Sequence, residues 1–143
     1  MRPEKVWTPE AVLDENQMLD SFFGPLSDLP LGIIVIDRRN NVRFFNAMAG
    51  YFLGIQPSLA LGKPINETMQ DLKITEVLST GVPHFDRRKL INGRLLKCSL
   101  APIEMGGQII FAAEFMQDDT EKISLETQLA ELRTKYEMLD MLL

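Results

Sequence analysis

Apolar side chains recur along the C-terminal segment in alternating steps of four and three residues. They stand at Leu125, Leu129, Leu132, Tyr136, Leu139 and Leu143, which we call the heptad stripe. A period of 3.5 residues keeps one narrow stripe of a helix turned towards a partner helix, as in coiled coils. A helix that packs on its own domain usually needs a wider apolar stripe. The pattern therefore predicts a helix over residues 119–143 that pairs two copies of the chain, and packing back on its own domain is the alternative.

Short β-type and helical patterns alternate in the first half of the chain. Residues 32–37 and 42–46 are rich in β-branched and aromatic side chains around a polar turn, which predicts a hairpin. Helical spacing precedes this hairpin from Thr8 to Gly24 and follows it over residues 46–54 and 71–80. We expect short helices that flank and cover a sheet.

Three further strands are predicted over residues 84–91, 94–103 and 108–117. Asn92-Gly93, a strong hairpin signal, separates the first two, and Gly106-Gly107 separates the last two. The last strand alternates, with Phe111, Ala113 and Phe115 on one side and Ala112, Glu114 and Met116 on the other. The order of elements predicts an α+β domain, in which five antiparallel strands carry short helices on one face.

Composition narrows the possible functions. With 143 residues the chain has room for one domain plus extensions, and 20 acidic against 15 basic residues give a net charge of −5. That balance argues against a nucleic-acid-binding surface. The single cysteine, Cys98, excludes an internal disulfide and is typical of a reducing compartment. No apolar run approaches membrane-spanning length. We therefore expect a cytoplasmic chain without direct nucleic-acid or membrane contacts.

A series of short motifs runs in order through residues 20–121. It comprises the hairpin at residues 32–46, Asn46, Ala49, Leu53 and Gly54 in the next helix, and the segments 61–64, 80–83, 91–93, 101–103, 106–107 and 118–121. This ordered set resembles a PAS domain, the sensory module of bacterial signalling proteins. Asp119 departs from the family's pattern, which usually has an apolar residue there.

The resemblance implies three regions and a role in signalling. These are an N-terminal extension with a flanking helix (residues 1–24), the PAS domain (25–118) and a coiled-coil output helix (119–143). The chain looks similar to PAS modules that precede the output domains of sigma-54-dependent activators and sensor histidine kinases, and we favour the activators. We expect a homodimer whose output domain follows in the same full-length chain. A purely structural dimerisation domain without a ligand is the alternative.

By the same resemblance, a small ligand would bind between the sheet and the short helices. The candidates to line such a pocket are apolar or weakly polar residues of the predicted strands and helices: Ile34, Ile36, Phe44, Tyr51, Phe52, Ile74, Leu78, Cys98, Leu100, Phe111 and Ala113. Each of them would also fill the core of a ligand-free domain. A closed interior packed with side chains therefore remains the alternative to a ligand pocket.

No enzymatic motif is present in the sequence, so we expect no catalytic activity. His84 is the only histidine and lies outside the helix on which haem-binding PAS proteins carry their ligand. Cys98 lies in a predicted strand, whereas the flavin-binding relatives carry their cysteine on a helix. We therefore expect no metal, haem or flavin cofactor. Two basic clusters, at residues 38–43 and 87–89, are interpreted as solvated hairpin faces, with an anion-binding patch as the alternative.

The junction between the last strand and the output helix is the predicted site of signal coupling. Asp118 ends the strand, Thr120 has a side chain suited to capping the helix, and Glu121 adds a negative charge at its positive end. The resemblance implies that these residues join the sensing sheet to the output helix. An ordinary helix cap without a signalling role explains the same residue types.

Overall fold

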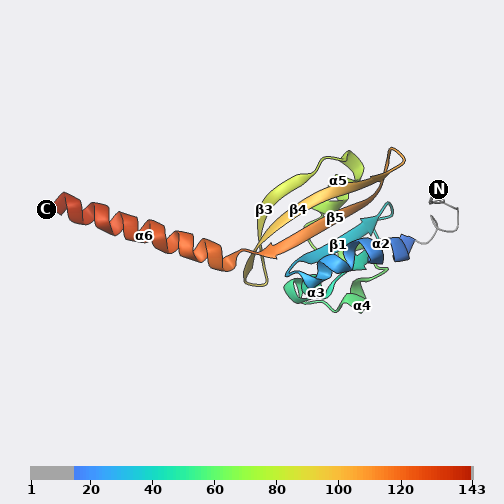
Figure 1. The fold of residues 1–143 in the computed structure, drawn as a ribbon, viewed down its shortest axis with the longest axis horizontal. Helices are drawn as coiled ribbons and strands as arrows, with labels where there is room; N and C mark the ends of the chain where they lie inside the picture. The colour runs from blue at the N-terminus through green and yellow to red at the C-terminus, as the bar shows by residue number, and fades with distance from the viewer. Residues whose placement is uncertain (1–14, 143) are drawn as a thin grey trace, which may run out of the picture.

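The computed structural model describes residues 15–142, apart from the side chains of residues 121–125 and 142 (Figure 1). The elements are α2 (Glu15–Phe23), η1 (Pro25–Asp28), β1 (Gly32–Asp37), β2 (Val42–Phe45), α3 (Ala47–Leu53), α4 (Pro57–Ala60), η2 (Ile65–Glu67), α5 (Lys73–Thr80), β3 (His84–Ile91), β4 (Arg94–Met105), β5 (Gln108–Asp118) and α6 (Thr120–Leu142). The predicted helix start at Thr8 lies outside the described residues, as do the side chain of Leu125 and the whole of Leu143.

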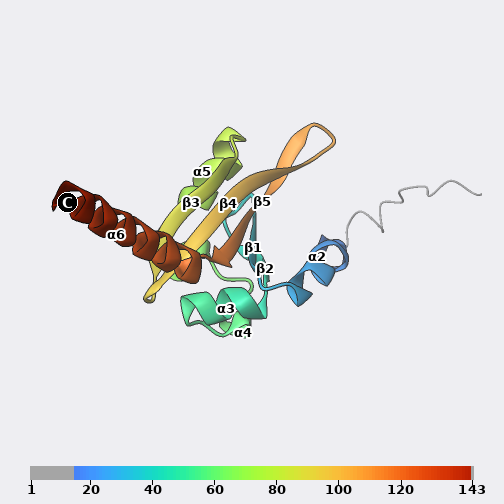
Figure 2. The ribbon, with the colours of Figure 1, turned by 60° about the vertical axis from the view of Figure 1, so that its left-hand side comes forward.

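The five strands form one antiparallel sheet in the order β2-β1-β5-β4-β3. The helices α3, α4 and α5 cover one face, which we call the inner face. Helix α2 packs on the opposite, outer face (Figure 2). The predicted α+β architecture is therefore confirmed, with the flanking helix on the other side of the sheet from the short helices.

Local sequence signals explain the start of α3. The Oδ1 atom of Asn46 accepts hydrogen bonds from the backbone N–H of Ala49 at 2.9 Å and of Ile33 at 2.9 Å. Its Nδ2 atom donates to the Leu31 carbonyl at 2.7 Å. Asn46 therefore caps α3 and also fixes that helix to β1, because one side chain satisfies backbone groups of both elements.

The turn between β3 and β4 has the predicted form. Asn92 and Gly93 both have positive φ values, 49° and 77°, as a tight two-residue hairpin requires. The Asn92 side chain also donates to the Phe52 carbonyl at 3.0 Å. This hairpin is thus held against the C-terminal turn of α3.

Helix α6 leaves the sheet and extends away from the domain (Figure 1). The described side chains of the heptad stripe are exposed, with Leu132 at 50% and Leu139 at 54%. The helix therefore does not pack back on its own domain along this stripe. No helix within residues 15–142 is long and apolar enough to cross a membrane.

Candidate functional site

Most of the predicted pocket residues lie together on the inner face. Ile34, Ile36, Phe52, Ile74, Cys98 and Leu100 are buried in one core cluster, and Leu78 packs against it partly buried. The sequence therefore identified much of the layer between the sheet and the short helices. The buried side chains pack against one another there.

The placement of four other candidates in this interior is wrong. Phe44, Phe111 and Ala113 lie in the outer core cluster beneath α2. Tyr51 is 60% exposed on the surface of α3. The alternation along β5 was predicted correctly, but the opposite set of side chains faces inward. The period of a strand defines two faces, and the packing of the whole sheet decides which one the helices α3–α5 cover.

The inner face carries a buried charged cluster that the sequence analysis missed. Glu114 of β5 is only 1% exposed, and its Oε2 atom accepts a hydrogen bond from Lys89 Nζ at 2.7 Å. The Lys89 side chain, from the edge strand β3, is 11% exposed and also lies 3.2 Å from Asp71 Oδ2. The interpretation of residues 87–89 as a solvated hairpin face is therefore wrong for Lys89.

Arg87 extends this cluster towards the surface. Its Nη2 atom lies 3.5 Å from the same Asp71 Oδ2 atom. The charges thus alternate in one chain from the interior outward: Glu114, Lys89, Asp71 and Arg87. Two buried atoms of this charged cluster, Glu114 Oε1 and Arg87 Nη1, have no hydrogen-bond partner among the described residues.

The cluster controls the charge states of its members. Burial opposes the charge of Lys89, but the Glu114 carboxylate outweighs it and raises the lysine pKa. Burial also opposes the charge of Asp71, but the Lys73 backbone N–H and the Lys89 ammonium lower its pKa overall. Both groups therefore remain charged near neutral pH, so the chain of charges persists there.

Cys98 lies on the same inner face and is fully buried. Burial and the neighbouring Glu114 carboxylate raise the pKa of its thiol to about 12. The side chain is therefore a neutral thiol at physiological pH and a poor nucleophile. No group of His, Cys, Asp and Glu side chains in the described part of the chain is arranged to hold a metal ion.

A groove of about 630 Å³ borders the charged cluster. Asp71 and Lys89 form part of its wall, and Thr68, Gln70 and Asn92 add polar groups. Its apolar lining includes Leu53, Met69 and Ile91. A ligand in this groove would contact two of the charged side chains directly.

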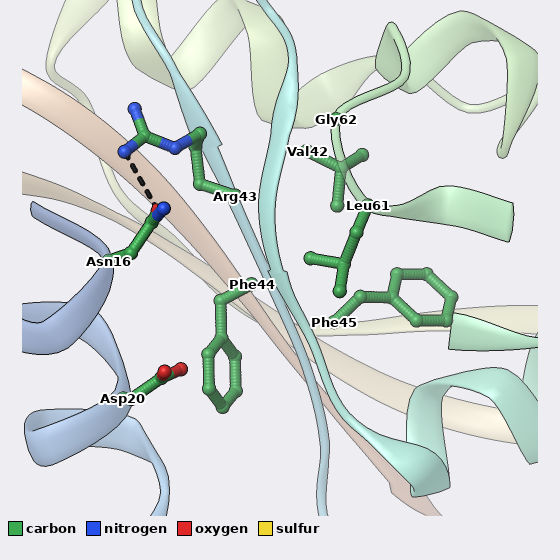
Figure 3. A pocket seen from close by; sticks show the side chains of 8 residues that line it. All are labelled: Asn16, Asp20, Val42, Arg43, Phe44, Phe45, Leu61 and Gly62. Atoms are coloured by element: carbon green, nitrogen blue, oxygen red, sulfur yellow. Dashed lines mark hydrogen bonds between the residues drawn. The ribbon is translucent and has the colours of Figure 1, made fainter. Parts of the chain in front are cut away.

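A second hollow, of about 510 Å³, lies between α2 and β2 (Figure 3). Arg43 is its cation, and it bonds to Glu15 Oε2 at 2.9 Å and to Asn16 Oδ1 at 2.9 Å. Figure 3 also shows Phe44 and Phe45 pointing to opposite sides of β2. Because its arginine is already paired, this hollow presents less unmet bonding capacity than the charged cluster.

The junction of β5 and α6 is tied to the start of β4. Asp118 Oδ1 accepts from the Thr120 backbone N–H at 2.9 Å, and Asp118 Oδ2 lies 3.2 Å from Arg94 Nη1. The Thr120 hydroxyl accepts from the Leu95 N–H at 2.9 Å and lies 3.4 Å from the Leu95 carbonyl. Thr120 is itself the first residue of α6, so the contacts described for its hydroxyl join the helix to β4. The side chain of Glu121 lies outside the description.

Arg94 connects this junction to α3. Its guanidinium carbon lies 4.3 Å from the centre of the Tyr51 ring, and its Nη2 atom donates to the Tyr51 hydroxyl. Asp119, the departure from the family pattern, is buried with its carboxylate 3.2 Å from Arg88 Nη1. The exposed Tyr51 is therefore a partner of the junction instead of a pocket residue.

Comparison with known proteins supports the fold. A family model described as the PAS fold matches residues 17–135. A protein of Halalkalibacterium halodurans named probable C4-dicarboxylate sensor kinase is 31% identical over 98 residues, which are 68% of this chain and 18% of that protein. The chain thus spans less than a fifth of that relative's length.

Two solved structures have the same fold at low sequence identity. The PAS domain of Bordetella pertussis BvgS aligns with a TM-score of 0.61 and 19% identity over 83% of this chain and 98% of that one. The PAS domain of nitrogen regulation protein NR(II) from Vibrio parahaemolyticus aligns with a TM-score of 0.51 and 17% identity, over 66% and 94% of the two chains.

Proposed function

Because the chain belongs to the PAS family, we propose that it is a sensory and homodimerisation module of a bacterial signalling protein. It passes a conformational change of the sheet to α6 and carries no catalytic step of its own. The observation that carries this proposal is the exposure of the described part of the heptad stripe, from Leu129 to Leu139, on a helix attached directly to the sheet. A single exposed helix of this kind is marginal in water, and pairing would bury its apolar stripe.

The junction supports the coupling part of the proposal. Asp118 and Thr120 bond both to each other and to the start of β4, so a shift of β4 against β5 would move the first turn of α6. Arg94 and Tyr51 extend these contacts to α3. A change on the inner face therefore has a short physical route to the helix.

We favour a sensor kinase as the full-length protein, with the module on its cytoplasmic side. The 31% identity to a protein named as a sensor kinase supports this choice. A sigma-54-dependent activator, which the sequence favoured, is the alternative output. A purely structural dimer without a ligand is the competing function, and ligand binding distinguishes it from a sensor.

Sedimentation velocity tests the dimer. The parent chain should sediment as a dimer at micromolar concentration, and Leu132→Asp/Leu139→Asp should be monomeric because it places four charges in the paired stripe. Met138→Asp/Met141→Asp is the matched control, since it adds the same charges at exposed positions outside the stripe. A monomeric parent chain, or equal effects of the two variants, would refute pairing through the stripe.

Coupling is tested in the full-length protein. Asp118→Ala removes the bonds to Thr120 and Arg94 and should uncouple output from stimulus while the sheet stays folded. Near-ultraviolet circular dichroism checks the fold, and output is measured with and without the stimulus. Normal stimulus-dependent output from this variant would leave Asp118 with a local structural role only.

A further inference from the structure

Arg87 has more donors than partners. Its guanidinium carries five N–H groups, and the ion pair described for it joins Nη2 to Asp71 Oδ2 at 3.5 Å. Its Nη1 atom is buried without a hydrogen-bond partner among the described residues. Buried donors of charged groups are costly to leave unpaired. An additional acceptor would therefore satisfy Arg87 Nη1, and a carboxylate is the group that matches a guanidinium best.

Glu114, on the same inner face, has a buried acceptor that lacks a strong donor. One oxygen accepts from Lys89, and no geometric hydrogen bond to the other, buried oxygen is described. The neighbouring Cys98 thiol, a weak donor, also interacts with this carboxylate. In the sheet register Arg87 lies opposite Cys98, and Leu100, the next inward residue of β4, lies opposite Glu114. The unmet donor and the unmet acceptor thus flank one stretch of β4 on the inner face.

Asp71 has the features of a stand-in for a ligand carboxylate. It lies between η2 and α5, outside any helix or strand, and is half-buried beside the groove. A single oxygen, Oδ2, serves both Arg87 and Lys89 at 3.5 and 3.2 Å. These distances exceed those of good charge-assisted hydrogen bonds, about 2.7–2.9 Å. An incoming carboxylate that displaced Asp71 could give one oxygen to each cation.

We propose that this cluster binds a small carboxylic acid that carries a hydroxyl or an ammonium group at C2. The acid's carboxylate replaces Asp71 on Arg87 and Lys89, and its C2 group donates to Glu114 Oε1. Chloride and sulfate would satisfy the cations but carry no hydrogen-bond donor for Glu114. The binding is independent of the proposed function, and only its transmission to α6 rests on that function.

Titration calorimetry with two matched sets of acids tests the class. Lactate and alanine are compared with propionate, and malate and aspartate with succinate, so that each set differs only at C2. At least one 2-hydroxy or 2-amino acid should bind at low millimolar concentration or better, about tenfold more tightly than its unsubstituted partner, the value of one hydrogen bond to a charged group. Equal binding of substituted and unsubstituted acids, or no binding by any of the six, would overturn the proposal.

Variants on one strand locate the site. Arg87→Gln should weaken binding of the preferred acid at least tenfold, since it removes the charge that the carboxylate meets. Arg88→Gln is the matched control, because the neighbouring arginine bonds to Asp119 on the other side of β3, and binding should be unchanged. Asp71→Asn should tighten binding, because the internal competitor loses its charge. Unchanged binding in Arg87→Gln, or weaker binding in Asp71→Asn, would contradict this assignment.

The outcomes separate this inference from the proposed function. If the parent chain is a dimer but binds none of the acids, only the ligand site is refuted. If the parent chain binds an acid but is monomeric, only the dimerisation is refuted. Melting temperatures of all variants, measured without ligand, show whether each one is folded. If Arg87→Gln is unfolded, the affinity of Asp71→Asn for the preferred acid, compared with that of the parent chain, still tests the proposed site.

Discussion

The two faces of the sheet bury similar strands but contain different chemistry. The outer face meets α2 mainly through apolar side chains, with Phe23 packed against Phe44 and Phe115. At the edge of this contact Arg43 bonds to Glu15 and Asn16 of α2. The inner face buries Glu114 and Lys89 within its apolar cluster. The central strand, β5, contributes to both faces, because its successive side chains alternate between them.

This difference separates packing from binding. A buried ion pair is weak evidence of stabilisation, because removing two charges from water costs about as much as their attraction returns. Among the described residues, the side chains that are fully buried beneath α2 are all apolar. We therefore expect the charges of the inner face to add little to folding stability, which leaves them available for the binding role proposed above.

Breaking half of the ion pair should have the largest effect. Lys89→Met leaves Glu114 buried without its partner and should lower the free energy of unfolding by about 3–5 kcal/mol. Urea denaturation at pH 7 measures the change. The double variant Lys89→Met/Glu114→Leu should recover most of the loss, because it removes both charges. A double variant as unstable as the single one would show that the pair itself stabilises the fold.

The outer face should respond to loss of volume instead of charge. Phe23→Ala removes a ring that is 2% exposed and should cost about 3 kcal/mol, the usual penalty for truncating a buried phenylalanine. Phe22→Ala, at a neighbouring position that is 68% exposed, is the control and should cost less than about 1 kcal/mol. Similar losses from both substitutions in urea denaturation would mean that α2 is not anchored through Phe23.

The end of β5, where the two faces meet α6, should show a smaller effect. Thr120→Val keeps the shape of the side chain but removes the hydroxyl that bonds to Leu95, and should cost about 1 kcal/mol. Thr134→Val, on the exposed surface of α6, serves as the control. Thermal unfolding followed by circular dichroism at fixed protein concentration measures both. Equal shifts for the two variants would argue against a specific tie between α6 and β4.

The pH dependence of Asp118 should be the smallest effect. Hydrogen bonds from the Thr120 side chain and backbone, together with Arg94, lower its pKa in the folded protein. A lowered folded pKa gives stability that is present above the unfolded pKa and is lost as the pH falls through the folded value. Asp118→Asn should therefore be less stable than the parent by under about 1 kcal/mol at pH 6, and the difference should begin to shrink as the pH falls below the unfolded pKa of about 3.9. A constant difference across this range would exclude the charge as its cause.

Lys89 should respond in the opposite direction. Its pKa is raised, so the stability from its charge is present below the unfolded pKa and is lost only as the pH rises through the folded value. The contribution of the Lys89 charge should therefore change in the alkaline range, whereas that of Asp118 changes in the acid range. The two pH profiles thus distinguish the inner face from the junction.

The sequence determined the elements and their order because the signals are local. The period of two in the strands, the cap at Asn46 and the Asn92-Gly93 turn depend on backbone geometry within a few residues. The spacing of the heptad stripe is equally local, and the structure leaves its described part exposed. These features follow from nearest neighbours along the chain, so a pattern was enough to predict them.

The charged cluster was decided by tertiary structure. Glu114 was the one charged residue inside an otherwise apolar stretch of β5, and that isolation was the available signal. Its partner Lys89 is separated from it by 25 positions and reaches it across β4, while Asp71 comes from a segment without regular structure. Local patterns place charges in solvent by default, and only the pairing of β3, β4 and β5 beneath α5 brings these side chains together inside the protein. Burial of charge is a property of the assembled sheet, because it depends on partners that no local spacing encodes.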